Sequence, residues 1–309
     1  MDDERRTSAD RLAGRQARGA AGFTLLEVMV SLAILSVSLV AILNLHSSSV
    51  RVHNHAKHLT VATLLARSKM IDIEERLLDE GLPEYTEQHQ GSFDEEGYPG
   101  NLDVWVNYTM TPDNCLKIHY QAISDKDTVL NLTNHTYFNL GGHSSGNILN
   151  HKIMINAAQF TPIDHQGIPT GEIRRVAGSP HDLRKLTSIV KGLCGDDEQV
   201  SLSRGYDHNW ILQEPGNLVV KAAELHEPQS GRTMSLYTTK PGLQFYTGNY
   251  LDGKLAGKQG AAYGKHSGLC LETQYFPDSM NHKQFPSPVL KKGEVYEHIT
   301  VYKFSAKNI

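Results

Sequence analysis

The sequence is poor in several features that mark particular classes of protein. Only three cysteines occur in 309 residues, Cys115, Cys194 and Cys270, and no two of them form a CxxC pair. This spacing indicates neither a disulfide framework nor a thiolate zinc site, so we expect buried free thiols. The 30 basic residues do not outnumber the 34 acidic ones, and a net charge of -4 gives no basic surface for nucleic acid. We therefore expect no nucleic-acid partner.

Histidine, by contrast, is abundant, with 16 residues. The cluster His53, His55 and His58 suggests a metal site, but two of its spacings do not place imidazoles on one face of a helix. A solvated polar surface explains the cluster equally well. We predict no metal site.

One long apolar run stands out in the first part of the chain. From Phe23 to Leu45 a single charge, Glu27, interrupts it. A helix with a rise of about 1.5 Å per residue makes this run roughly 35 Å long, enough to cross a bilayer core of about 30 Å. A secretory signal peptide would have a shorter apolar region and a small-residue cleavage site after it, and no such site closes this run. The run therefore predicts a membrane segment over residues 23–45.

The start of this run resembles the type IV prepilin signature, with Gly22 before Phe23 and Glu27 four residues later. The resemblance implies a leader over residues 1–22, cleavage by a prepilin peptidase between Gly22 and Phe23, and methylation of the new terminus at Phe23. It also implies that Glu27 pairs with the terminal amine of a neighbouring subunit. A carboxylate in hydrocarbon costs roughly 2.5–3.5 kcal/mol on insertion scales and needs a partner. An ordinary anchor helix with one stray acid remains the alternative.

Helical periodicity continues beyond the membrane segment and ends near Gly81 and Pro83. The apolar positions of this amphipathic stripe are Leu59, Thr63, Ala66, Met70, Ile73 and Leu77. The stretch "LLARSKMIDIEERLLDEG" further resembles the minor pseudopilins of type II secretion systems. That resemblance implies one long helix over residues 23–90 and other pseudopilin subunits as partners. The leader arginines predict a single-pass inner-membrane protein whose following part is periplasmic.

A change of pattern marks the next part of the chain. "EYTEQHQGSFDEEGYPGN" has no apolar periodicity, and we place a linker over residues 91–101. Alternating apolar residues then predict two strands, at 102–110 and 116–122, and similar runs recur at "NLVVKAAEL", "TMSLYTT" and "HITVYKF". Only a short helical turn is expected, near "HDLRKLTSIV". The fold class is therefore mainly β, a large antiparallel sandwich over residues 102–309 preceded by a long amino-terminal α-helix with a transmembrane half.

Four phrases within the β region contain polar residues suited to chemistry. They are "NLTNHTYFNLGG", "SRGYDHNWIL", "KPGLQFYTGN" and "LETQYFPDS", which hold His135, Asp207, Gln244 and Glu272. Taken singly, a histidine beside aromatic residues is more often structural, and a strand glutamate more often faces water. Together, in this order, they resemble the galactose mutarotase (aldose 1-epimerase) family over residues 94–309.

The resemblance implies a β-supersandwich with an open sugar-binding cleft and no cofactor. It assigns His135 as general acid, Glu272 as general base, and Asp207 and Gln244 as ligands of a hexose, galactose or glucose. Opening a cyclic hemiacetal requires one proton to leave the anomeric hydroxyl and another to reach the ring oxygen, and carboxylate and imidazolium suit these two tasks. Trp210 and Phe138 are aromatic residues that either stack on the sugar or belong to the core.

The chain departs from the family in its leading segment. Before residue 94 it has no Asn-Arg pair and no His-Gly-Gly phrase, which supply two active-site contacts in the family. We therefore expect the supersandwich to be incomplete. The favoured interpretation is an aldose 1-epimerase-like domain that interconverts hexose anomers and is anchored by a pilin-like helix. The alternative is a structural minor pseudopilin with a non-catalytic β head.

Overall fold

The computed structural model describes residues 85–94, for which only the backbone is considered, together with residues 98–212, 219–254 and 256–306. Leu82–Ile309 form one compact unit. The predicted leader, the membrane segment 23–45, the processing residues Gly22, Phe23 and Glu27, and the histidine cluster lie outside the described residues. Within the described residues, no helix has both the length and the apolar character needed to cross a membrane.

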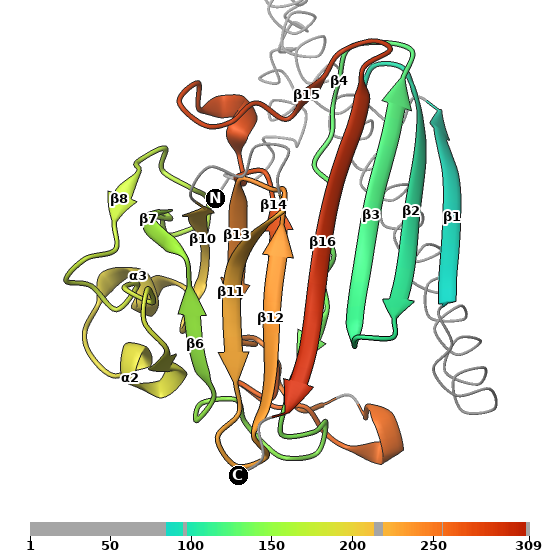
Figure 1. Cartoon of the computed structure of the whole chain (residues 1–309). Helices are drawn as coiled ribbons and strands as arrows, with labels where there is room; N and C mark the ends of the chain where they lie inside the picture. The colour runs from blue at the N-terminus through green and yellow to red at the C-terminus, as the bar shows by residue number, and fades with distance from the viewer. Residues whose placement is uncertain (1–84, 95–97, 213–218, 255, 307–309) are drawn as a thin grey trace, which may run out of the picture. The chain divides into compact units, whose positions relative to one another are not determined.

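The larger of two main sheets has eight antiparallel strands in the order β1-β2-β3-β16-β12-β11-β6-β9 (Figure 1). Their bounds are β1 Tyr85–Asp94, β2 Asn101–Thr111, β3 Cys115–Ser124, β16 Val295–Ala306, β12 Arg232–Thr238, β11 Val220–His226, β6 Lys152–Ile155 and β9 Thr187–Ser188. The two strands expected at 102–110 and 116–122 are confirmed as β2 and β3. The three later alternating runs are confirmed as β11, β12 and β16.

The second sheet has six strands in the order β5-β14-β13-β10-β7-β8, again antiparallel. Their bounds are β5 Tyr137–Phe138, β14 Leu269–Gln274, β13 Gly242–Tyr246, β10 Asp207–Leu212, β7 Ala157–Thr161 and β8 Arg174–Arg175. A further two-stranded pair joins β4 Thr128–Val129 to β15 Val289–Leu290. The helices among the described residues are short: α2 Ile189–Leu193, α3 Glu198–Leu202 and the 3-10 turns η1 Lys258–Gly260 and η2 Ser279–Asn281.

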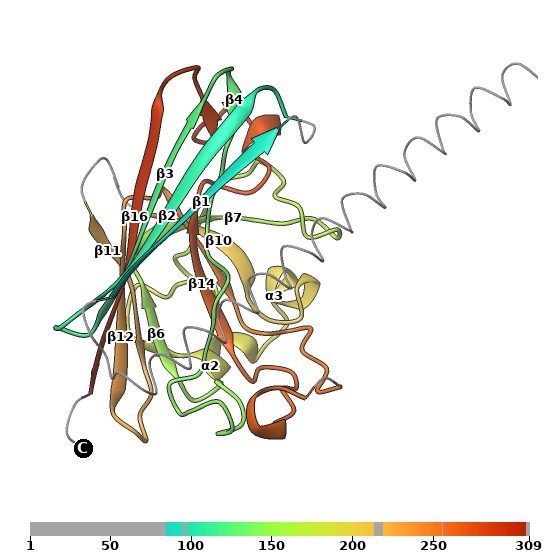
Figure 2. The same cartoon turned by 90° about the vertical axis from the view of Figure 1, so that its right-hand side faces the viewer.

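The two main sheets lie as layers over one apolar core (Figure 2). Hydrogen bonds connect the layers: the Tyr302 hydroxyl of β16 donates to the Leu271 carbonyl of β14 at 2.7 Å. The hydroxyls of Thr273 and Thr300 lie 2.6 Å apart between the same two strands. Buried polar groups require such partners, so these contacts fix how the layers sit against each other. The prediction of a mainly β, antiparallel fold is confirmed.

The amino-terminal edge of the larger sheet differs from the sequence prediction. Residues 85–90 were expected to end the long helix and residues 91–94 to belong to the linker, but Tyr85–Asp94 form strand β1, paired antiparallel with β2 along its whole length. That part of the domain prediction is wrong. The residues of β1 are mostly polar, and an edge strand needs only backbone hydrogen bonds to one neighbour, so no apolar alternation marks it.

Candidate active site

The site is built on β10, β13 and β14, which are neighbours in the six-stranded sheet. Side chains alternate between the two faces of a strand. Leu243, Phe245 and Leu271 therefore point into the core and are fully or almost fully buried. The residues between them face the opposite side, where they form the floor of a cleft.

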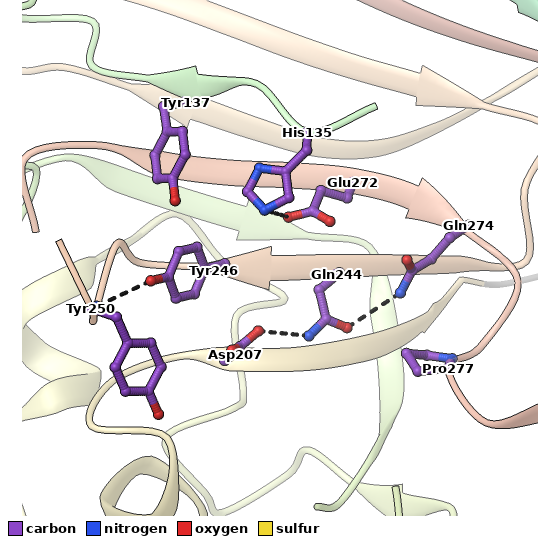
Figure 3. A pocket seen from close by; sticks show the side chains of 9 residues that line it. All are labelled: His135, Tyr137, Asp207, Gln244, Tyr246, Tyr250, Glu272, Gln274 and Pro277. Atoms are coloured by element: carbon purple, nitrogen blue, oxygen red, sulfur yellow. Dashed lines mark hydrogen bonds and ion pairs between the residues drawn. The ribbon is translucent and has the colours of Figure 1, made fainter. Parts of the chain in front are cut away.

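The register of the sheet brings distant residues together on this floor. Gln244 of β13 lies directly opposite Glu272 of β14, and Asp207 of β10 lies opposite Tyr246. The cleft has a volume of about 390 Å³. It is lined by His135, Tyr137, Asp207, Gln244, Tyr246, Tyr250, Glu272, Gln274 and Pro277 (Figure 3). All four residues singled out from the sequence thus line one cleft.

His135 and Glu272 point toward one another in this cleft (Figure 3). Their closest atoms, Nε2 and Oε1, are 3.5 Å apart. His135 precedes the two-residue strand β5, which pairs with β14 through Tyr137 and Cys270 and so brings the imidazole beside the carboxylate. The His135 side chain is 54% exposed and that of Glu272 only 11%. The carboxylate is therefore fixed in the sheet, whereas the imidazole stands at the open side.

A row of amide and carboxylate groups lies beside this pair. The Gln274 amide donates to the Gln244 side-chain oxygen at 3.3 Å, and the Gln244 amide donates to Asp207 Oδ1 at 2.8 Å. The row orients Gln244 so that its donor faces Asp207. Such polar groups, convergent in a cleft, are suited to binding hydroxyl-rich ligands.

Burial changes the acidity of both carboxyl groups. The pKa of Glu272 is raised to about 7. Burial away from water is the larger cause, and the nearby charge of Asp207 is the smaller one. The pKa of Asp207 is also raised, chiefly by burial, although the hydrogen bond from Gln244 and the charge of His135 act in the opposite direction. A carboxyl group with a pKa near neutrality is suited to accept and return a proton at physiological pH.

Aromatic side chains form the other end of the cleft. The rings of Tyr137 and Tyr246 pack edge to face with centroids 6.2 Å apart, and Tyr250 stacks on Tyr246 at 6.5 Å. Trp210, one of the two aromatics considered for sugar stacking, is fully buried in the core. Phe138 is partly buried and packs against Tyr302 with centroids 5.1 Å apart. The stacking faces available in the cleft are therefore tyrosines.

Sequence reasoning missed the tyrosines and Gln274. A signal existed for Tyr246 and Gln274, because each stands two residues after a predicted site residue of the same strand and therefore shares its face. Tyr137 follows His135 by two residues, but His135 lies before strand β5. Tyr250 and Pro277 lie in loops, where no such periodicity applies. For metals, one group of donors lies in the described part of the chain: ligand atoms of His135, Cys270 and Glu272 fall within 4.8 Å of one another.

Two family models match this chain. The aldose 1-epimerase family matches residues 84–303, and the prokaryotic N-terminal methylation motif matches residues 17–43. The chain belongs to the aldose 1-epimerase family. It also carries the prepilin-type methylation motif, as the resemblance around Gly22 and Phe23 indicated.

Individual relatives support the family assignment. The galactose mutarotase of Bos taurus is 50% identical over 212 residues, which are 68% of this chain and 60% of that protein. The aldose 1-epimerase of Escherichia coli K12 is 40% identical over 215 residues, or 69% of this chain and 61% of that protein. The chain thus spans about 60% of the length of these curated relatives.

Solved structures confirm the galactose mutarotase fold. A GalM/aldose epimerase homologue from C. elegans superimposes with a TM-score of 0.65 at 28% identity, covering 74% of this chain and 68% of that one. Galactose 1-epimerase from Lactobacillus acidophilus NCFM gives a TM-score of 0.62 at 29% identity, with 72% and 63% covered. The chain therefore shares the fold of these proteins over about three quarters of its length.

Proposed function

We propose that the compact unit Leu82–Ile309, called the β unit below, interconverts the α and β anomers of a hexose, galactose or glucose, by general acid-base ring opening. The observation that carries the proposal is the pairing of His135 with Glu272, 3.5 Å apart, in a cleft that also holds the Gln244–Asp207 hydrogen bond. The cleft volume of about 390 Å³ lies within the range of roughly 300–1,000 Å³ typical of small-molecule sites.

In the proposed mechanism Glu272 is the base and His135 the acid. The Glu272 carboxylate takes the proton of the anomeric hydroxyl while the His135 imidazolium gives a proton to the ring oxygen, and the bond between C1 and that oxygen breaks. The open aldehyde turns about its C1–C2 bond. Closure on the other face reverses both proton transfers and yields the second anomer. Asp207 and Gln244 hold the sugar hydroxyls during this turn. Because the steps are proton transfers and the breaking and re-forming of one C–O bond, without oxidation or reduction, we propose no cofactor.

Polarimetry of freshly dissolved α-D-galactose or α-D-glucose tests the proposal on the full chain in detergent. Glu272→Gln should lower the rate above the spontaneous background by at least about 100-fold, since a positioned acid-base group contributes roughly 10²–10⁴. Glu297→Gln is the matched control, because Glu297 lies on β16 outside the cleft with its side chain 56% exposed. Equal catalysis by wild type and Glu272→Gln would reject the enzyme function and favour the non-catalytic head of a minor pseudopilin.

We further propose that the amino-terminal segment anchors this unit in the inner membrane with the β unit in the periplasm. The support is the methylation motif at residues 17–43 together with the apolar run over residues 23–45. Prepilin peptidase should cut between Gly22 and Phe23. Mass spectrometry of membrane-extracted protein should find a methylated amino-terminal Phe23, and an intact Met1 in cells that contain the peptidase would contradict this step. Other pseudopilin subunits are the partners that the motif suggests.

A further inference from the structure

Cys270 lies beside the proposed catalytic pair and has no part in the proton transfers described above. It is on the same strand and the same face as Glu272, two residues away. Its sulfur is buried and lies 3.6 Å from Nδ1 of His135. The other two thiols are elsewhere: Cys115 is buried on β3, and Cys194 is exposed after α2.

His135, Cys270 and Glu272 together present an imidazole nitrogen, a thiol sulfur and a carboxylate oxygen, all within 4.8 Å of one another. These are the three kinds of ligand that zinc takes in proteins. They also come from two separate segments of chain, the loop before β5 and strand β14, so their proximity is a product of the fold. A site with three protein ligands leaves a fourth tetrahedral position for water or another ligand.

The distances show how much the side chains must move to bind one ion. Ligands about 2.0–2.3 Å from a tetrahedral zinc lie roughly 3.3–3.6 Å from each other. His135 Nε2 is 3.5 Å from the Glu272 carboxylate, and Nδ1 is 3.6 Å from the Cys270 sulfur, so the imidazole must turn to offer one nitrogen to both. The His135 side chain is 54% exposed and has room to turn, whereas Cys270 and Glu272 are held in the sheet.

We propose that His135, Cys270 and Glu272 form a binding site for Zn²⁺ and that this ion inhibits the enzyme. Binding forms bonds from the metal to sulfur, nitrogen and oxygen, and the thiol proton passes to solvent. The ion then occupies the lone pairs through which Glu272 accepts a proton and His135 carries one. The inhibition rests on the proposed function, whereas the binding does not.

Cobalt absorption tests the binding without any assay of activity. Co²⁺ replaces Zn²⁺ in such sites, and a cobalt-thiolate bond gives a charge-transfer absorption that nitrogen and oxygen ligands alone do not give. The parent is the full chain in detergent with Cys194→Ser, which removes the exposed thiol. We expect this absorption band in the parent and in the matched control Cys115→Ser. Added Zn²⁺ should displace the Co²⁺ and so remove the band. Cys270→Ser should abolish it.

His135→Ala provides a second variant whose altered side chain lies at the open side of the cleft, so the core is left intact. It should weaken Co²⁺ affinity by more than the roughly 10- to 100-fold expected for loss of an outer-shell contact. In the mutarotation assay, Zn²⁺ should inhibit the parent, and Cys270→Ser should need at least tenfold more Zn²⁺ for the same fractional inhibition.

Two results would overturn the proposal: a folded parent without the thiolate band, or a band that persists in Cys270→Ser. A protein that lacks mutarotase activity but shows the Cys270-dependent band would reject the proposed function and leave the metal site standing.

Discussion

Two buried histidines make the folded β unit sensitive to acid. His181 and His208 are both fully buried, with ring centroids 4.6 Å apart, and His181 also stacks on Phe160 at 4.1 Å. Neither ring nitrogen of His181 has a hydrogen-bond partner among the described residues. Burial lowers the pKa of His181 from 6.5 to about 4 and holds that of His208 well below its usual value. Both rings are therefore neutral in the folded protein at neutral pH.

The loss of folding stability in acid can be calculated from the difference between the pKa of the histidine in the folded and the unfolded protein. A base whose pKa is lower in the folded state than in the unfolded state contributes stability that is fully present above pH 6.5 and is lost as the pH falls toward 4. For His181 the loss between pH 7.5 and pH 5.0 is about 2 kcal/mol, at about 1.36 kcal/mol per pKa unit. His181→Phe keeps a flat ring against Phe160 and removes the titration. The variant should therefore lose about 2 kcal/mol less than wild type over the same interval.

Urea unfolding followed by tryptophan fluorescence measures this difference, because Trp210 lies in the core with its ring 5.5 Å from that of His181. The comparison uses the change between pH 7.5 and pH 5.0, so any effect of the larger phenyl ring at neutral pH cancels. His165→Phe is the control, since His165 is exposed and follows β7 in a loop. Parallel pH dependence in wild type and His181→Phe would refute the reasoning, because it would mean that His181 is solvated or paired.

Two further predictions concern the cleft. With EDTA present to exclude metal, kcat/KM for mutarotation should fall as the pH drops below about 7, and the fall should approach tenfold per pH unit. The reason is that Glu272 must be ionised to act as the base, and its pKa is about 7. A rate profile that begins to fall only near pH 4.5 would contradict this. Gly242→Ala should cost about 1–3 kcal/mol in urea unfolding, because the new Cβ would lie 2.3 Å from Asn209 Oδ1 and 3.1 Å from the Gln274 carbonyl oxygen. Gly264→Ala, with nothing within 4 Å of the added carbon, should cost less, and equal losses would show that the close packing of β13 against β10 and β14 is not the cause.

The strands were predictable from the sequence where one face is buried. In β3 the alternation of Ile118, Tyr120 and Ala122 with polar neighbours appears directly in their burial. Strand β1 was not predictable, because its backbone pairing with β2 leaves no apolar pattern. The apolar periodicity ends near Gly81, and the expected helix reached residue 90 only through the resemblance to minor pseudopilins.

The candidate site was predictable as a set of residues and not as a geometry. The four phrases identified His135, Asp207, Gln244 and Glu272, but only the register between β13 and β14 places Gln244 opposite Glu272. The environment of each side chain in the cleft could not be predicted from the sequence either. A strand glutamate most often faces water, whereas the side chain of Glu272 is only 11% exposed and lies near Asp207, and that burial is the main cause of its raised pKa. Such properties depend on residues more than 60 positions apart, which no local pattern encodes.

His135 precedes β5, the two-residue strand at one edge of the six-stranded sheet, and its side chain is 54% exposed. The proposed base, by contrast, lies on β14, between β13 and β5, and its strand neighbours Leu271 and Thr273 are buried. The position of Glu272 is therefore fixed by the core, and so is that of Gln244 opposite it. His135 alone depends on the loop at the open side, which makes the acid, rather than the base or the sugar ligands, the adjustable part of the site.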